Sequence, residues 1–140
     1  MKGTASRVFV LALLLMFVLA LASTSAQTPV RIELWHWWGD QAEEFDKLLE
    51  RFHAAYPDIQ VEAVSLPFSD RESKALLALL TDTGPDVLMA TRSEVIRFAD
   101  RGLIVPIEPY IDKAGIDLGD FYPGEVEAFR WNGVLWTLPM

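Results

Sequence analysis

Residues 31–40, R-I-E-L-W-H-W-W-G-D, decide the fold, because a strand, a break and a helix start follow one another within this stretch. Residues 31–37 are rich in branched and aromatic side chains, which predicts a β-strand that Trp38-Gly39 ends. Residues 40–43 have the spacing of a capping box, with an aspartate in place of the usual Ser or Thr. Apolar residues then recur at helical spacing over 45–56, so a strand followed by an amphipathic helix is predicted.

The same order of elements repeats twice further along the chain. Residues 59–65 alternate between apolar and polar, and residues 87–90 form a short apolar run typical of a strand buried on both faces. The helix after the first of these strands is predicted to start with a capping box at Ser69. The helix after the second is predicted to be capped by Ser93 and ended by Gly102. The order β-α-β-α-β-α predicts an α/β fold with a parallel sheet and right-handed crossovers.

The pattern changes after residue 102. Two prolines exclude a central strand over 103–109, and residues 110–119 are predicted as a loop or short helix. A further helix is predicted within 121–129. Residues 130–136 predict a hairpin, because Asn132-Gly133 favours a tight type I′ turn. The sequence stops in apolar residues, from which we expect a fragment of a longer protein.

The first 26 residues have the layout of a secretory signal peptide. Lys2 and Arg7 precede an unbroken apolar run over 8–22, and small and hydroxyl residues follow up to Ala26, where cleavage is expected; an earlier site lies at 20–22. The apolar run is shorter than the roughly 20 residues that a membrane-spanning helix needs, so a cleaved signal is favoured over a retained anchor. The chain has no cysteine for lipid attachment.

The chain is acidic, with 12 Lys and Arg against 20 Asp and Glu. The signal segment holds two of the cations and no acid, so the remaining 114 residues carry a net charge of −10. Nucleic acid is therefore not expected as a partner, because phosphate contacts need clustered Lys and Arg. A neutral or cationic ligand fits better, although the acidity is equally explained as a device for solubility. The lack of cysteine excludes disulfides, thiolate zinc sites and cysteine nucleophiles.

Three loops follow the predicted parallel strands, and ligands of open parallel sheets bind beyond these carboxyl ends. Flat aromatic rings occur there beside short polar groups. This mixture suits a sugar, whose apolar face stacks on a ring while its hydroxyls need donors and acceptors. One of the adjacent Trp37 and Trp38 is expected to face the core and the other the rim. The candidate ligand-binding residues are Trp37, Trp38, Gly39, Asp40, Phe68, Ser69, Thr91, Arg92, Ser93 and Glu94, of which Arg92 and Glu94 form a candidate charge pair.

Four further residues are interpreted as structural. Trp35 is expected in the core, and His36 is expected to be a satisfied strand histidine. His53 is placed on the polar side of its helix and has no metal-ligand spacing to His36. Asp86, after Gly-Pro, is expected to fix its loop rather than to contact a ligand.

Catalytic signatures are absent from the sequence. It has no nucleophile elbow, zinc-protease helix, phosphate-binding loop or dinucleotide fingerprint, so no enzyme activity, metal or cofactor is expected. A glycosidase would need a carboxylate pair on the rim, for which Asp40 and Glu94 are the nearest candidates.

The motifs together resemble the bacterial extracellular solute-binding proteins of family 1, the sugar-binding receptors of ABC importers. The resemblance implies a periplasmic-binding-protein-like type II fold, in which two α/β lobes close on a ligand by a hinge. Residues 27–140 would then be an incomplete N-terminal lobe with the β-α-β-α-β-α core. The matching segments are R-I-E-L-W-H-W-W-G-D, F-D-K-L-L-E-R-F-H-A-A-Y-P-D-I-Q-V, T-G-P-D-V-L-M-A, F-A-D-R-G-L-I-V-P-I-E-P-Y-I-D and W-N-G-V-L-W-T-L-P-M.

The resemblance also implies a ligand, a membrane partner and a cellular location. A monomeric periplasmic receptor would bind a mono- or oligosaccharide and deliver it to permease subunits in the inner membrane, with the three rim loops as ligand contacts. Ala90 stands where some members place a stacking tryptophan, so a maltose-like stacking pattern is not expected. The alternatives are the same fold binding a polyamine, an oligopeptide or another non-sugar solute, an exported carbohydrate-active hydrolase, and a small interaction domain.

Overall fold

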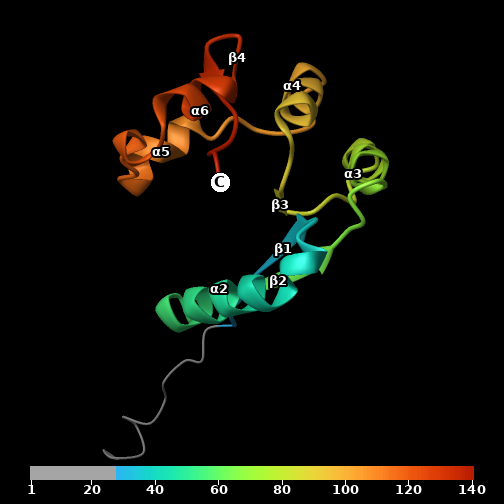
Figure 1. Cartoon of the computed structure of the whole chain (residues 1–140), viewed down its shortest axis with the longest axis vertical. Helices are drawn as coiled ribbons and strands as arrows, with labels where there is room; N and C mark the ends of the chain where they lie inside the picture. The colour runs from blue at the N-terminus through green and yellow to red at the C-terminus, as the bar shows by residue number, and fades with distance from the viewer. Residues whose placement is uncertain (1–27) are drawn as a thin grey trace, which may run out of the picture.

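The computed structural model describes residues 28–140, so the predicted signal segment lies outside the described residues. The predicted β-α-β-α-β-α order is confirmed, and a helical and hairpin region follows it (Figure 1). No helix within the described range has the length and apolar character needed to cross a membrane. The elements are β1 (Val30–His36), η1 (Gly39–Gln41), α2 (Ala42–Ala55), β2 (Ile59–Ser65), α3 (Arg71–Leu80), β3 (Val87–Leu88), α4 (Arg92–Asp100), α5 (Glu108–Ala114), η2 (Leu118–Asp120), α6 (Pro123–Ala128), β4 (Arg130–Trp131) and β5 (Val134–Leu135).

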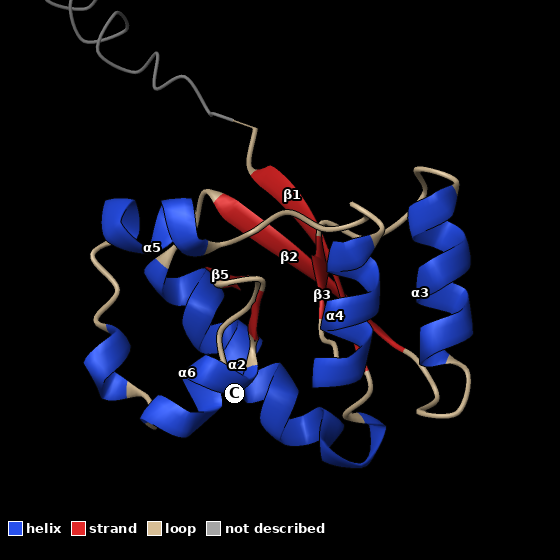
Figure 2. Ribbon diagram, turned by 90° about the horizontal axis from the view of Figure 1, so that it is seen from above, coloured by secondary structure: helices blue, strands red, loops and turns tan. Residues whose placement is uncertain are grey.

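The first three strands, red in Figure 2, form one parallel sheet, and their order in it is β2-β1-β3. The central strand β1 pairs with β2 along its whole length, from Val30 opposite Ile59 to His36 opposite Ser65. It pairs with β3 over two residues only. Because all three strands run in the same direction, their carboxyl ends lie at one edge of the sheet, as the sequence predicts.

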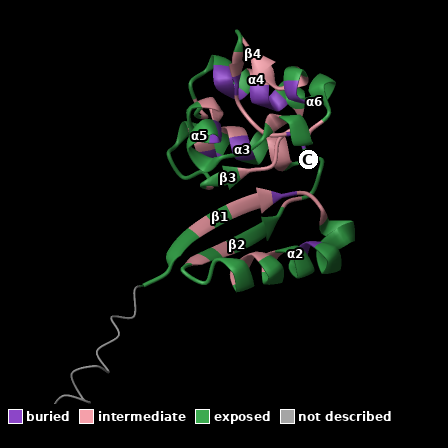
Figure 3. Cartoon of the chain, turned by 90° about the vertical axis from the view of Figure 1, so that its left-hand side faces the viewer, coloured by how far each residue is buried: buried purple, intermediate pink, exposed green. Residues whose placement is uncertain are grey.

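Helix α2 packs along β1 and β2 (Figure 3). Its apolar stripe places Phe45, which is buried, against the ring of His36, with ring centroids 4.2 Å apart. His53 is half-buried on the same helix, and its Nε2 accepts a hydrogen bond from the backbone N–H of Val61 at 3.0 Å. The placement of His53 on the polar side of the helix is therefore wrong, because this ring satisfies a backbone donor of β2, an edge strand of the three-stranded sheet.

The predicted caps of the first two helices are also wrong. Asp40 lies inside the 3₁₀ turn η1, and α2 starts after Gln41 without a side-chain cap. Ser69 lies one position too early, because Asp70 is the N-cap position of α3, and the hydroxyl of Ser69 donates to the Asp70 carboxylate at 2.9 Å.

The start of α4 differs from its prediction as well. Thr91, not Ser93, is the N-cap, because Thr91 has the extended backbone that an N-cap requires while Ser93 lies within the helix. Thr91 and Glu94 form a complete capping box. At the other end of α4, Gly102 follows the helix with a φ of +67°, as predicted for a helix terminator.

Strand β3 is shorter and less buried than predicted. It covers two residues, and the side chain of Val87 is 44 % exposed, so the expectation of a strand buried on both faces is wrong. Within the described part of the chain, β3 forms the edge of the sheet and has β1 as its one pairing partner.

The C-terminal elements form a small core of their own. Ile111 of α5, Val126 of α6 and Leu135 of β5 are buried together. The predicted hairpin is confirmed, because Asn132 and Gly133 both have positive φ, 52° and 79°, as a type I′ turn requires. Residues 103–107 form no strand, and α5 supplies the short helix predicted in this region.

Candidate functional site

A cleft of about 320 Å³ lies at the carboxyl ends of β1 and β2. The predicted site residues Trp37, Gly39, Asp40 and Phe68 all line it. The structure therefore brings together the loops after the first two strands, as expected from a parallel sheet. The cleft is also lined by Ser65, the last residue of β2, and by Leu66 and Pro67, which follow it; none of the three is among the predicted site residues.

The two adjacent tryptophans separate as predicted. Trp37 meets Phe68 edge to face, with centroids 5.9 Å apart and ring planes at 77°. Trp38 instead packs edge to face on the buried Phe45 of α2, with centroids 5.7 Å apart. Trp37 is therefore the tryptophan that belongs to the cleft.

Arg71, the first residue of α3, lies against both rings of the cleft. Its guanidinium carbon is 3.5 Å from the ring centroid of Phe68 and 4.9 Å from that of Trp37. The same guanidinium donates a hydrogen bond to the backbone carbonyl of Phe68. Sequence reasoning missed Arg71, although its position one helical turn after Phe68 is a signal for such a contact.

Glu94 is buried rather than open to the cleft. The residue is 2 % exposed, and its Oε2 accepts hydrogen bonds from the backbone N–H and the hydroxyl of Thr91, both at 2.6 Å. Its Oε1 lies 3.3 Å from a terminal nitrogen of Arg71. The predicted pair between Arg92 and Glu94 is wrong, because Arg92 donates from Nε to the carbonyl of Ala128 at 2.6 Å. Residues two apart on a helix do not face each other.

The remaining predicted rim residues lie outside the cleft. Ser69 and Ser93 are exposed, and the hydroxyl of Ser93 lies 3.3 Å from that of Thr91. The loop between β3 and α4 is thus connected to the cleft by the ion pair between Glu94 of α4 and Arg71 of α3.

His36 is a structural residue, as predicted. It is 6 % exposed, and its Nδ1 accepts a hydrogen bond from the backbone N–H of Trp38 at 3.2 Å. Burial lowers the pKa of His36 below its usual value, and the negative charge of Asp46 opposes this only in part. The neutral imidazole is therefore the form that the fold favours.

Asp86 and Trp35 also have structural contacts. The carboxylate of Asp86 accepts a hydrogen bond from the backbone N–H of Glu33 at 2.9 Å, which confirms that it fixes its loop to β1. Trp35 is half-buried, and its indole N–H donates to the Glu33 side chain, so it is less enclosed than the predicted core residue.

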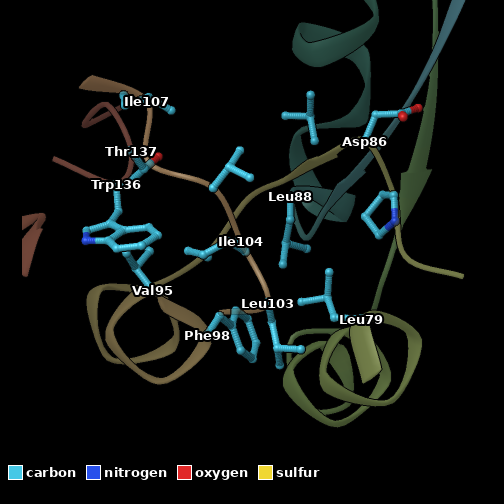
Figure 4. A pocket seen from close by; sticks show the side chains of 14 residues that line it. Leu79, Asp86, Leu88, Val95, Phe98, Leu103, Ile104, Ile107, Trp136 and Thr137 are labelled. Carbon is cyan, nitrogen blue, oxygen red and sulfur yellow. The ribbon is translucent and has the colours of Figure 1, made fainter. Parts of the chain in front are cut away.

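A second hollow of about 340 Å³ lies between β3, α4 and residues 103–107 (Figure 4). Its lining is mostly aliphatic, with Phe98 and Trp136 as aromatic members. The carboxylate of Asp86 at its margin already accepts the Glu33 N–H. The hollow lacks the converging polar groups that a sugar needs. Over the described residues, no group of three or more potential metal ligands occurs.

Comparisons with known proteins agree with this architecture. The maltotriose-binding protein of Pyrococcus abyssi is 27% identical over 110 residues, which are 78% of this chain and 23% of that protein. The sugar-binding protein MalE of Xanthomonas citri superposes with a TM-score of 0.72 at 27% identity, covering 79% of this chain and 28% of that one. An ABC substrate-binding protein from Listeria monocytogenes, in complex with cycloalternan, has a TM-score of 0.71 at 19% identity and shows the fold alone.

The chain therefore spans about a quarter of the length of these relatives. The predicted type II periplasmic-binding-protein fold is confirmed by the structural neighbours. Residues 38–140 match the profile of the family described as bacterial extracellular solute-binding protein. This match covers more than half of the sequence, and the chain belongs to the bacterial extracellular solute-binding protein family.

Proposed function

We propose that this protein is the substrate-binding component of an ABC importer, and that it binds a mono- or oligosaccharide and delivers it to permease subunits in the inner membrane. The observation that carries the proposal is the cleft beyond β1 and β2, where Trp37 and Phe68 stand beside Asp40. The protein would act by binding and release, without covalent chemistry.

The chemistry of the cleft supports a sugar ligand. The side chain of Phe68 is 59% exposed although Arg71 covers part of its ring, so it offers a flat apolar surface to a pyranose. Asp40 is exposed and can accept hydrogen bonds from sugar hydroxyls, and Ser65 can both donate and accept. Hydrogen bonds to a carboxylate are stronger than those between neutral groups.

The relatives support the same ligand class. The names of the Pyrococcus abyssi and Xanthomonas citri proteins record a maltotriose-binding and a sugar-binding protein. The remainder of such a protein would supply a second lobe that closes on the ligand. The ligand would then shift the open–closed equilibrium by its greater affinity for the closed form.

The proposal includes the remaining contacts and the location. Residues 1–26 would be a cleaved signal, and residues 27–140 part of the N-terminal lobe of a monomeric periplasmic receptor. Trp37, Gly39, Asp40 and Phe68 would form the first ligand contacts. Ser69, Thr91, Arg92 and Ser93 would contact a longer oligosaccharide, and Glu94 would act through its ion pair with Arg71.

Calorimetric titration of the full-length protein with maltotriose, glucose and putrescine tests the ligand class. Asp40→Asn is expected to weaken sugar binding about tenfold to a hundredfold, from the strength of hydrogen bonds to a charged group. Tyr122→Ala, an exposed aromatic in the C-terminal elements, is the matched control and should leave the affinity unchanged. Heat with putrescine alone would overturn the sugar assignment. Release of reducing ends from glycans, abolished by Asp40→Asn, would instead establish a hydrolase.

A further inference from the structure

We infer that Arg71 is a positioning residue, which holds the rings of Trp37 and Phe68 in the orientation that a sugar needs for stacking. This inference rests on the proposed function and assigns a role to a residue that does not line the cleft. The guanidinium lies against both rings and forms an ion pair with the buried Glu94.

The contacts of Arg71 explain how it could orient the rings. Its planar guanidinium lies 3.5 Å from the centroid of Phe68, within the range of a cation–π contact, and 4.9 Å from that of Trp37. It also donates to the carbonyl of Phe68 and so holds the backbone as well as the ring. Trp37 and Phe68 come from different loops, so one cation fixes the angle between them.

The anchor of Arg71 connects the third loop to the cleft. Glu94 is 2% exposed, and its second oxygen completes the capping box of α4 through Thr91. The carboxylate thus cannot swing away without uncapping the helix. The chain of contacts from Thr91 through Glu94 and Arg71 to Phe68 and Trp37 joins all three loops at the carboxyl ends of the strands.

The pair is poorly arranged for stability alone. Among the residues that the structure describes, Arg71 Nε and Glu94 Oε1 are both buried and have no hydrogen-bond partner. A buried ion pair with unmet hydrogen bonds is weak evidence for stabilisation, because the desolvation of both charges opposes their attraction. What this geometry does achieve is a fixed position for the guanidinium plane against the two rings.

The chain contains a matched control on the same two helices. Helices α3 and α4 lie side by side in Figure 2, and Arg97 of α4 pairs with Glu72 of α3, so this ion pair also bridges the helices. Both partners are more exposed, 47% and 38%, against 13% and 3% for Arg71 and Glu94. The same substitution at Arg97 therefore alters a bridge between α3 and α4 without changing a contact to the two rings.

The test compares Arg71→Lys with Arg97→Lys in the full-length protein. Lysine retains the charge beside Glu94 but lacks the guanidinium plane. Arg71→Lys is expected to weaken the near-ultraviolet circular dichroism of the aromatic residues and to raise the Kd for maltotriose about tenfold. Arg97→Lys is expected to leave both quantities at the wild-type values.

A double-mutant cycle separates positioning from a general loss of structure. If Arg71 acts through the ring, Arg71→Lys should add little to the loss of maltotriose affinity in a Phe68→Leu background. Full additivity of the two substitutions, or wild-type dichroism and affinity in Arg71→Lys, would overturn the inference. A wild-type protein that binds no sugar would overturn the proposed function, and the dichroism comparison would still decide whether Arg71 orders the rings. An Arg71→Lys variant that does not fold is replaced by Arg71→Gln, judged by the same readouts.

Discussion

Replacing Glu94 with alanine removes a buried carboxylate and is expected to lower the free energy of unfolding by about 4 kcal/mol. Breaking a buried ion pair costs about 3–5 kcal/mol, because the remaining charge is left without a partner. The side chain of Arg71 is 13% exposed and can be partly hydrated, which places this contribution near the lower end. Loss of the capping contacts to Thr91 adds about 1 kcal/mol.

Urea denaturation of the full-length protein, followed by tryptophan fluorescence, measures this loss. Glu72→Ala is the control, because its ion pair with Arg97 is half-exposed and should contribute about 0.5 kcal/mol. Glu94→Gln retains an oxygen that can accept from Thr91, so it should lose less than Glu94→Ala. Equal losses for Glu94→Ala and Glu72→Ala would refute the reasoning, since burial would then have no effect on the strength of the pair.

Three further changes test other parts of the fold. Leu135→Ala should destabilise the protein by about 3 kcal/mol in urea denaturation, because the side chain is fully buried, whereas Val105→Ala, 70% exposed, should have little effect. Because burial lowers the pKa of His36, the neutral ring stabilises the fold fully above pH 6.5, the usual pKa of histidine. This contribution to the free energy of unfolding falls as the pH drops from 6.5 towards the lowered pKa. The unfolding free energy should therefore fall more between about pH 7.5 and about pH 5.5 in the wild type than in His36→Gln, and equal falls would contradict the assignment. Gly133→Ala should destabilise the hairpin by about 1–2 kcal/mol in urea denaturation because of its positive φ, while Gly124→Ala, in the first turn of α6 with open space around it, should be neutral or stabilising by the same measurement.

The order of the helices and strands could be predicted because local hydrophobic periodicity in the sequence indicates each element. The alternation over 59–65 and the helical stripe over 45–56 each repeat at the period of the element that they form. The Asn132-Gly133 turn is equally local, since both residues must adopt positive φ whatever surrounds them. The parallel sheet then follows from the alternation of strands and helices.

The helix caps could not be predicted to the residue. Ser69 and Asp70 are both good capping residues, and so are Thr91 and Ser93. Which residue becomes the cap depends on where the chain turns from extended to helical, and the tertiary path sets that point. Local preference thus placed the helices but not their first residues.

Part of the candidate site could be predicted from the order of the strands, and part could not. Trp37 and Phe68 could be placed at one edge because the strands that precede them are neighbours. The contact between Arg71 and Glu94 joins residues from two helices, and no periodic pattern in the sequence encodes how those helices pack. The sequence therefore predicts Glu94 as a ligand contact or a partner of Arg92, whereas its burial beside Arg71 depends on tertiary structure.

The arrangement behind the cleft bears on how the proposed receptor would reach its affinity. A ligand that must order aromatic side chains on arrival loses part of its binding energy to that ordering, and a preformed site avoids the loss. Here Arg71 contacts the ring of Phe68, Glu94 pairs with Arg71, and Thr91 donates to Glu94, so residues of the chain itself order the rings. The free-energy cost of desolvating the Arg71–Glu94 pair arises once, on folding, and each binding event then uses rings that are already ordered. The ion pair is therefore better understood through what it does for the rings than through what it adds to the stability of the lobe.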